Sequence, residues 1–265
     1  MATVIIYDKD GTLMKFDSFW VPVARHALKE LFLSATENRK LAVELTEKAE
    51  LLAGVKNGKT DPSGVLCSGT YSQLAKIVTG VLNGVGYEKT VTKSEVEKAM
   101  SEAVKYGKSL PSSENLREKL LEAKKVAKLF VVTTDEPVIT QICLERLKIA
   151  DLFEKIYCDD GKFPHKPDPA AAYEIEKLTG ADKSEIYMVG DTSTDCSFAM
   201  NAGINFVSVG TCEKIKSSAC YNAANAAEAT DYILSRFKGG CDCLAAGVYN
   251  AGGEMSDEKF TGFIG

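Results

Sequence analysis

The chain has 265 residues, 45% hydrophobic and 26% charged, which is typical of a globular protein that buries a substantial core in one or two domains. Its net charge of −5 argues against nucleic acid as the main partner, because proteins that track a phosphate backbone usually carry a basic surface. With no signal peptide and no apolar run approaching ~18 residues, we expect a cytoplasmic protein without a membrane partner.

The first predicted strand, residues 3–7, leads directly into the sequence DKDGT, which begins at Asp8. Because side chains alternate in an extended segment, Asp8 and Asp10 can point to one side while Lys9 points away. Two carboxylates at the end of a buried strand suit metal-assisted chemistry on a negatively charged substrate. The plain alternative is a solvated acidic turn, and an EF-hand is a weaker rival because no Glu stands at the twelfth position.

More than 100 residues separate the first strand from the next, and a structureless loop of that length is implausible. The sequence predicts helices in this segment, at residues 18–33, 37–53, 70–83 and 93–106. A long loop rich in Gly, Lys, Asp, Pro and Ser covers residues 54–69. We therefore interpret residues 15–108 as an inserted helical domain.

Short apolar runs in the second half of the chain alternate with helical patterns. Strands are predicted at residues 128–132, 155–158, 186–189 and 205–209, and helices at 112–127, 137–149, 169–180 and 194–202. Such alternation indicates βαβ crossovers, and hence an α/β fold with a doubly wound parallel sheet covered by helices on both faces.

Polar residues follow three of the predicted strands directly: Asp8, Thr133 and Asp191. Ligands of doubly wound folds bind outside the carboxyl ends of the strands. We therefore expect these three side chains to meet at one edge of the sheet.

The last segment, residues 239–265, is rich in Gly and Ala and lacks clear periodicity, which is typical of a docked or disordered tail. Of the eight cysteines, Cys241 and Cys243 form a C-x-C pair with no second pair, so a zinc site is not expected. Scattered reduced thiols fit a cytosolic protein.

Four motifs now stand in order: DKDGT, a strand ending in VVTT at residues 131–134, HKPDP at 165–169 and GDTSTD at 190–195. With them the chain resembles the haloacid dehalogenase (HAD) superfamily, in its phosphatase branch, and most of all the phosphoglycolate phosphatases. The resemblance implies a Rossmann-like core at residues 1–14 and 109–238, with residues 15–108 as a helical cap domain.

The resemblance implies that Mg²⁺ is the cofactor and that it is held by Asp8, the backbone carbonyl of Asp10, and Asp191. Asp8 would attack the phosphorus to form an aspartyl-phosphate, and Asp10 would act as general acid and then as general base. Dehalogenases of this fold lack an acid at the position of Asp10, so its presence favours a phosphatase or a phosphomutase.

By the same resemblance, Gly11, Thr133, Thr134 and Lys166 would bind the phosphate oxygens, and Asp195 would steady Lys166 or a metal-bound water. Each has a plain alternative. Thr133 could simply cap a strand, Lys166 could be a solvated lysine before a proline, and Asp195 could be a first-turn helix residue.

The leading function is a Mg²⁺-dependent phosphatase acting on a small phosphorylated metabolite. A phosphomutase of the β-phosphoglucomutase type and a non-catalytic regulator that binds phosphorylated ligands are the alternatives. Phosphonate hydrolysis would need a lysine from the cap, such as Lys56 or Lys59. Substrate specificity is predicted at Ser68, Gly69 and Thr70, where a helix start could hold an anionic substrate group.

Overall fold

The structure is a computed structural model that describes residues 3–210 and 213–238. The predicted tail at 239–265, with Cys241 and Cys243, lies outside the described residues. Within the described part of the chain, no helix is long and apolar enough to cross a membrane.

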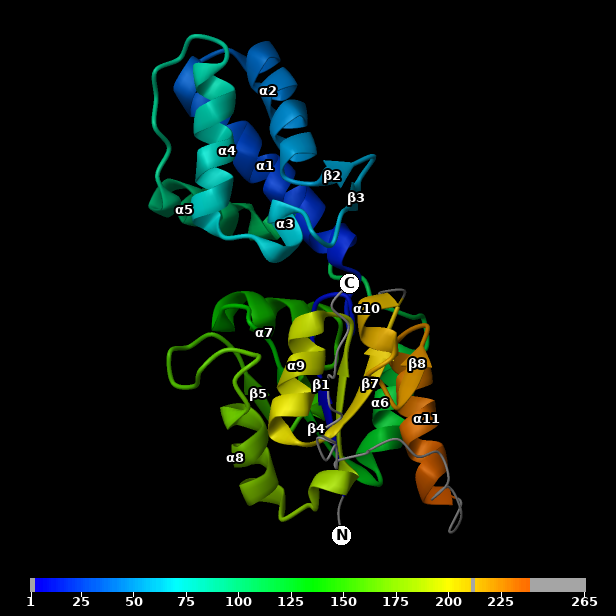
Figure 1. Ribbon diagram of the computed structural model, residues 1–265. Coiled ribbons are helices and arrows are strands. Elements are labelled where there is room, and N and C mark those ends of the chain that lie inside the picture. Colours follow the sequence, from blue (N-terminus) through cyan, green and yellow to red (C-terminus); the bar gives the residue numbers. More distant parts are fainter. Residues whose placement is uncertain (1–2, 211–212, 239–265) are drawn as a thin grey trace, which may run out of the picture.

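A parallel sheet of six strands forms the centre of the molecule, in the order β5-β4-β1-β6-β7-β8 (Figure 1). The strands are β1 (Thr3–Tyr7), β4 (Ala127–Val132), β5 (Lys155–Tyr157), β6 (Ile186–Gly190), β7 (Asn205–Val209) and β8 (Tyr221–Ala223). From β1 the chain adds β4 and then β5 on one side of the sheet, and it then returns to the other side of β1 to add β6, β7 and β8. The order therefore reverses between β1 and β6, which is where doubly wound folds bind their ligands.

Alternation along β1 sends its side chains into two cores. Ile5 and Tyr7 join the cluster under α6 (Leu116–Lys124) and α11 (Ala226–Lys238). Val4 and Ile6 join the cluster under α8 (Ala170–Thr179) and α9 (Ser193–Ala202). Since all four side chains are fully buried, β1 is apolar on both faces, as the central strand of a covered parallel sheet should be.

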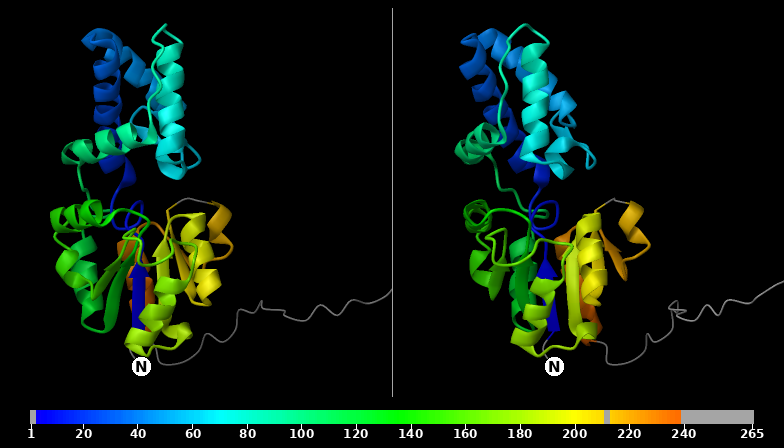
Figure 2. Two further views of the ribbon diagram at one scale, coloured as in Figure 1. Left: turned by 90° about the vertical axis from the view of Figure 1, so that its left-hand side faces the viewer. Right: turned by 60° about the vertical axis from the view of Figure 1, so that its left-hand side comes forward.

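The segment between β1 and β4 is a helical insertion, residues 16–106, that stands over the carboxyl ends of the strands (Figures 1 and 2). Its elements are α1 (Phe16–Thr36), α2 (Arg39–Leu52), β2 (Val55–Lys56), β3 (Lys59–Thr60), α3 (Val65–Ser68), α4 (Tyr71–Asn83), α5 (Lys93–Ala103) and the 3₁₀ turn η1 (Val104–Tyr106). These helices bury a hydrophobic cluster of their own, to which α7 (Pro137–Arg146) adds Ile139 and Cys143. The division of the chain after residue 14 and before residue 109 stays a prediction.

The doubly wound sheet predicted from the sequence is confirmed, but several element bounds differ. The predicted helix at 112–127 is shorter, since β4 already begins at Ala127. The predicted loop at 54–69 contains the hairpin β2-β3 and the short helix α3. Outside the predicted elements lie β8, α10 (Glu213–Lys216), α11 and the 3₁₀ turns η2 (Ala150–Leu152) and η3 (Lys183–Glu185).

Two chain crossings connect the insertion to the sheet, and backbone hydrogen bonds join them to each other. The Lys15 N–H donates to the Leu110 carbonyl at 2.9 Å, and the Lys108 N–H donates to the Ser18 carbonyl at 3.0 Å. Pro22 lies inside α1 and has no N–H to offer the Ser18 carbonyl one turn earlier. The bond from Lys108 therefore satisfies an acceptor that the proline leaves open.

The second crossing also sets a steric limit. Gly107 has an ordinary φ of −69°, but an added methyl group there would lie 2.5 Å from the ring of the fully buried Phe19. We expect Gly107→Ala to lower the free energy of unfolding by about 1–3 kcal/mol, because the ring has no room to yield. Gly80→Ala, in the middle of α4 with open space around it, should instead raise it by about 0.5–1 kcal/mol. Urea unfolding of both variants checks this, and a neutral Gly107→Ala would contradict the packing described here.

Candidate active site

The register of the sheet brings three polar positions to its carboxyl edge. Tyr7, the last residue of β1, pairs with Val131 of β4 on one side and with Val189 of β6 on the other. The chain therefore reaches Asp8, Thr133 and Asp191 at nearly the same height of the sheet. Asp8 and Asp191 flank the point between β1 and β6 where the strand order reverses.

The ammonium group of Lys166 joins two of the acidic side chains. Its Nζ lies 2.6 Å from Asp8 Oδ1 and 2.5 Å from Asp195 Oδ1. All three residues are buried, with exposed fractions of 8% for Lys166, 7% for Asp8 and 1% for Asp195. The alternative reading of Lys166 as a solvated lysine is therefore wrong.

The carboxylate of Asp195 binds both the Lys166 ammonium and the start of α9. Its Oδ1 accepts from Lys166, while its Oδ2 accepts from the N–H of Thr192 at 3.0 Å and from the Thr192 hydroxyl at 2.6 Å. The Thr192 hydroxyl in turn accepts from the Asp195 N–H, which completes a capping box at the start of α9. Both expected contacts of Asp195, at the helix start and with Lys166, are present.

Asp191 lies against the turn after β1. Its Oδ1 accepts from the Thr12 hydroxyl at 3.0 Å. Gly11 has a φ of +80°, and a methyl group on it would lie 2.1 Å from Asp191 Oδ2. Only glycine fits this position, for both its backbone angle and its close contact with the carboxylate.

Three carboxylates form a cluster suited to a metal ion. One oxygen each from Asp8, Asp191 and Asp195 can lie within 4.8 Å of one another. Hard divalent cations such as Mg²⁺ prefer such oxygen ligands, and among the residues that the structure describes only the Lys166 ammonium pairs with this cluster. The donor set and its excess of negative charge fit a bound cation. The third carboxylate of this cluster is that of Asp195. The predicted metal ligand from Asp10 is its backbone carbonyl and not its carboxylate.

The crowding of these carboxylates also shifts their ionisation. Burial raises the pKa of Asp8 to about 7, against the ammonium of Lys166 and with further repulsion from Asp195 and Asp10. Burial and the charges of Asp8 and Asp195 raise the pKa of Asp191 well above its usual range. Burial disfavours the charged form of Lys166, but Asp195 and Asp8 outweigh it and raise the pKa of the lysine.

The side chain of Asp10 takes different partners from that of Asp8. Asp10 Oδ2 accepts from Lys9 Nζ at 2.6 Å, and the same ammonium lies 2.8 Å from Asp135 Oδ2. The other oxygen of Asp10, Oδ1, is buried and has no hydrogen-bond partner. Burial and the charge of Asp10 raise the pKa of Asp135 to about 7, against the attraction of Lys9.

The predicted phosphate-binding residues are only partly free in this structure. Thr133 is buried, and its hydroxyl accepts from the Asp135 N–H at 3.3 Å, whereas Thr134 is exposed. The Gly11 N–H donates to the Met14 carbonyl at 2.8 Å. Its predicted role as a phosphate donor would therefore require that bond to break.

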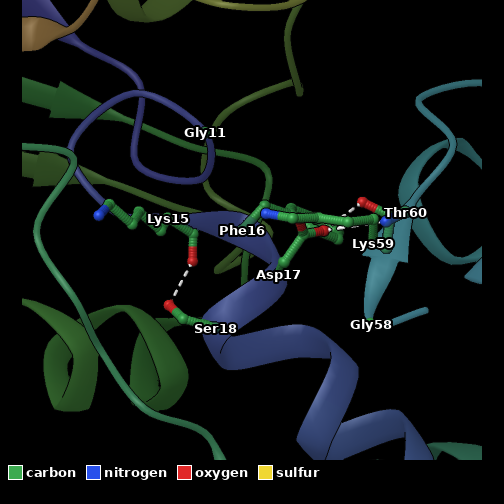
Figure 3. Close-up of a pocket in the computed structure, with 8 residues that line it drawn as sticks. All are labelled: Gly11, Lys15, Phe16, Asp17, Ser18, Gly58, Lys59 and Thr60. Atoms are coloured by element: carbon green, nitrogen blue, oxygen red, sulfur yellow. Dashed lines mark hydrogen bonds and ion pairs between the residues drawn. The ribbon is translucent and has the colours of Figure 1, made fainter. Parts of the chain in front are cut away.

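A cavity of about 490 Å³ opens beside Gly11, between the turn after β1 and the insertion (Figure 3). The lining residues come from the turn, from the start of α1 and from the β2-β3 hairpin: Gly11, Lys15, Phe16, Asp17, Ser18, Gly58, Lys59 and Thr60. The predicted specificity residues do not line it. Thr70 forms a capping box with Gln73 at the start of α4, and Ser68 and Gly69 are exposed. Their role in specificity stays a prediction.

The hairpin is fixed to α1 by Asp17. Its Oδ1 accepts from the Thr60 N–H at 3.1 Å and from the Thr60 hydroxyl at 2.6 Å, and Lys59 Nζ lies 3.2 Å from its Oδ2 (Figure 3). Sequence reasoning missed this hairpin, although Asn57-Gly58 is a strong signal for a two-residue hairpin turn. It also missed Asp135, which no local pattern distinguishes.

The family model of haloacid dehalogenase-like hydrolases matches residues 5–209, and this span includes Asp8, Lys166 and Asp195. The chain belongs to this family. No curated protein matches the chain.

Several solved structures share the HAD fold with this hydrolase. A candidate β-phosphoglucomutase from Thermotoga maritima is 17% identical with a TM-score of 0.61, and the match covers 90% of this chain and 99% of that one. A predicted phosphoglycolate phosphatase from Haemophilus somnus is 19% identical with a TM-score of 0.60, covering 87% and 97%. A candidate HAD hydrolase from Bacillus subtilis, bound to magnesium, is 15% identical with a TM-score of 0.59, covering 88% and 98%.

The shared ammonium of Lys166 gives a prediction about stability. Lys166→Met in this HAD hydrolase leaves Asp8 and Asp195 buried without a counter-charge, which should cost about 3–5 kcal/mol in metal-free buffer at about pH 8. Because the folded-state pKa of Asp8 is raised to about 7, the folded protein holds this proton more tightly than the unfolded chain. Binding of this proton stabilises the folded protein at low pH, and that contribution is lost as the pH rises through about 7. Since Asp8 is largely protonated at about pH 5, Lys166→Met should lower the free energy of unfolding by less there than at about pH 8.

Urea unfolding in excess chelator at both pH values measures the cost. Lys93→Met is the control, since Lys93 forms an exposed pair with Glu97 at 3.0 Å and should change stability by less than about 1 kcal/mol. An equal cost for Lys166→Met at both pH values would contradict the pairing described here.

Proposed function

We propose that this HAD hydrolase is a Mg²⁺-dependent phosphatase that acts on a small phosphorylated metabolite through a phosphorylated Asp8. The observation that carries the proposal is the buried carboxylate of Asp8, held by Lys166 at 2.6 Å beside Asp191 and Asp195. A nucleophile in this position meets its substrate in the crevice where the strand order reverses.

The cluster offers the ligands that magnesium requires. Asp8 and Asp191 would hold the ion, with the backbone carbonyl of Asp10 as the third protein ligand that the family resemblance implies. The carboxylate of Asp195 lies close to both, but its two oxygens already accept hydrogen bonds from Lys166 and Thr192. Bound Mg²⁺ would reduce the repulsion between a phosphate dianion and Asp8 and orient both. The magnesium-bound hydrolase from Bacillus subtilis, which has the same fold, supports this choice of ion.

The first half of the reaction transfers the phosphoryl group to the protein. An oxygen of Asp8 attacks the phosphorus, and the bond between the phosphorus and the leaving-group oxygen breaks. Asp10 donates its proton to that oxygen, so the product leaves as an alcohol. Lys166 and the Thr133 hydroxyl would bind the phosphate oxygens that carry the negative charge.

The second half restores Asp8. Asp10, now ionised, removes a proton from a water molecule as the water oxygen attacks the phosphorus. The bond between the Asp8 oxygen and the phosphorus breaks, which releases inorganic phosphate and the free carboxylate. Asp10 ends the cycle protonated, as it began.

The helical insertion supports a small substrate. We infer that it acts as a cap, because it stands over the carboxyl ends of the strands (Figure 2). The cavity of about 490 Å³ between it and the turn after β1 falls in the usual range for small-molecule sites. The fold shared with a predicted phosphoglycolate phosphatase agrees with a metabolite of this size.

Measuring phosphate release from a panel of phosphorylated metabolites tests the proposal. We expect turnover of at least one small alkyl phosphate, with release of inorganic phosphate. Transfer of the phosphoryl group to another position of a sugar phosphate, without net release, would indicate a phosphomutase, the activity for which the candidate β-phosphoglucomutase from Thermotoga maritima is named. Tight binding of phosphorylated ligands with neither reaction would indicate a regulator.

The two aspartates after β1 should respond differently to substitution. Asp8→Asn removes the nucleophile and should leave no measurable turnover. Asp10→Asn should lower kcat for an alkyl phosphate by about 10²–10⁴-fold, but by less than about tenfold for an aryl phosphate, since a phenolate leaves without a proton. Steady-state kinetics on both substrates decides, and equal losses would contradict the role of Asp10.

Metal binding should depend on pH. Because burial raises the pKa of Asp8 to about 7 and that of Asp191 well above its usual range, protons compete with the metal at lower pH. Mg²⁺ should therefore raise Tm more at about pH 8 than at about pH 5.5, and excess chelator should abolish turnover. Asp191→Asn should lose most of the Mg²⁺-dependent increase in Tm. Full activity in chelator, or equal increases in Tm at both pH values, would exclude this metal site.

A further inference from the structure

Lys9 is a lysine whose side chain is fully buried, with an exposed fraction of 0%. Its ammonium lies 2.6 Å from Asp10 Oδ2 and 2.8 Å from Asp135 Oδ2. The rings of Phe19 and Trp20, at the start of α1, have their centroids 5.8 Å and 5.9 Å from the same nitrogen. These contacts come from the turn after β1, from the loop after β4 and from the insertion.

A buried ion pair of this kind is weak evidence for stability. Removing an ammonium and its counter-ions from water costs several kcal/mol per ion, and well-packed apolar groups of the same volume often serve a fold equally well. The environment of Lys9 is already apolar on one side, where Phe19 and Trp20 pack edge to face with a centroid distance of 5.1 Å. A leucine or methionine would satisfy that side, so packing alone does not explain the charge.

What the charge does fix is the carboxylate of Asp10. The Lys9 ammonium donates to one oxygen, Oδ2, while the other, Oδ1, is buried and has no hydrogen-bond partner. A carboxylate held by one oxygen cannot rotate freely about its terminal torsion, so the position of the free oxygen is determined. Proton transfer requires such a fixed oxygen within hydrogen-bond reach of the reacting atom.

We propose that Lys9 is a positioning residue that holds Asp10 Oδ2 and so directs Asp10 Oδ1 toward the leaving-group oxygen. This inference rests on the proposed phosphatase function. The expectation that Lys9 points away from both aspartates is wrong for Asp10, whose Oδ2 lies 2.6 Å from the ammonium. The same ammonium lies 2.8 Å from Asp135 Oδ2, and the rings of Phe19 and Trp20 in α1 lie 5.8 Å and 5.9 Å from it, so three separate segments of the chain hold it in place.

The test compares Lys9→Met with the wild type on an alkyl phosphate and on p-nitrophenyl phosphate. Methionine keeps the length and much of the volume of the side chain but removes its charge. We expect kcat for the alkyl phosphate to fall by about 10–100-fold with KM nearly unchanged, because a misplaced general acid slows the chemical step without weakening binding. For p-nitrophenyl phosphate, whose leaving group needs no proton, kcat should stay within about threefold.

Lys155→Met is the matched control. Lys155 also pairs with a carboxylate, Glu174, and lies over two aromatic rings, at 4.6 Å from Tyr157 and 5.6 Å from Phe163. It lies at the start of β5, at the opposite end of the strand from the carboxyl edge, and makes no contact with Asp10. Its loss should leave kcat for both substrates within about twofold. Because the Lys155 side chain is 43% exposed, this control covers the loss of a lysine with a carboxylate and two aromatic neighbours, and the effect of burial is tested by the double variant below.

A second variant tests whether Lys9→Met loses activity only because it no longer folds. Lys9→Met leaves Asp10 and Asp135 without their counter-ion, whereas Lys9→Met/Asp135→Asn removes one positive and one negative charge together. The double variant should unfold at a temperature close to that of the wild type and still show the selective loss on the alkyl phosphate. An equal fall of kcat on both substrates in the double variant would show that Lys9 is merely structural.

A crystal structure of the double variant gives a result that does not depend on turnover. We expect the Asp10 carboxylate to leave the position it has beside Lys9 or to occupy more than one position. If Asp10 stays in place, Lys9 does not position it, whatever the substrate proves to be. If the wild type hydrolyses neither phosphate but Asp10 moves, the proposed phosphatase function fails while the positioning contact stands.

Discussion

The crowding of carboxylates at one edge of the sheet is the constraint on which the site depends. Asp8, Asp191 and Asp195 approach one another because β1 and β6 are neighbours in register and because α9 begins directly after β6. The Lys166 ammonium, at 2.6 Å from Asp8 and 2.5 Å from Asp195, offsets part of this repulsion. The remaining negative charge is what a divalent cation would neutralise, so stability and metal binding arise from the same cluster.

The two aspartates of the first motif occupy separate electrostatic environments although one residue separates them. Asp8 faces Lys166, and Asp10 faces Lys9. Each of the two carboxylates therefore has its own buried lysine: Lys166 pairs with Asp8 and Asp195, and Lys9 pairs with Asp10 and Asp135.

Much of this could be predicted from the sequence, because the relevant residues stand directly after apolar strands. The alternation of strands and helices alone predicts that Asp8, Thr133 and Asp191 lie at one edge of the sheet, and the register of the strands confirms it. The contact of Lys9 with Asp135 could not be foreseen, since it depends on where the loop after β4 passes relative to the turn after β1. The strand β8 has three residues and a mixed burial pattern, which is too little signal for periodicity.

The central claim is that Asp8 carries the phosphoryl group during turnover. Mass spectrometry of the protein, mixed with substrate and quenched in acid within the first turnovers, tests it directly. We expect the peptide containing Asp8 to gain the mass of one phosphoryl group, and Asp8→Asn to abolish this gain. Phosphate release by the wild type with no labelled peptide, or with the label on another residue, would contradict it.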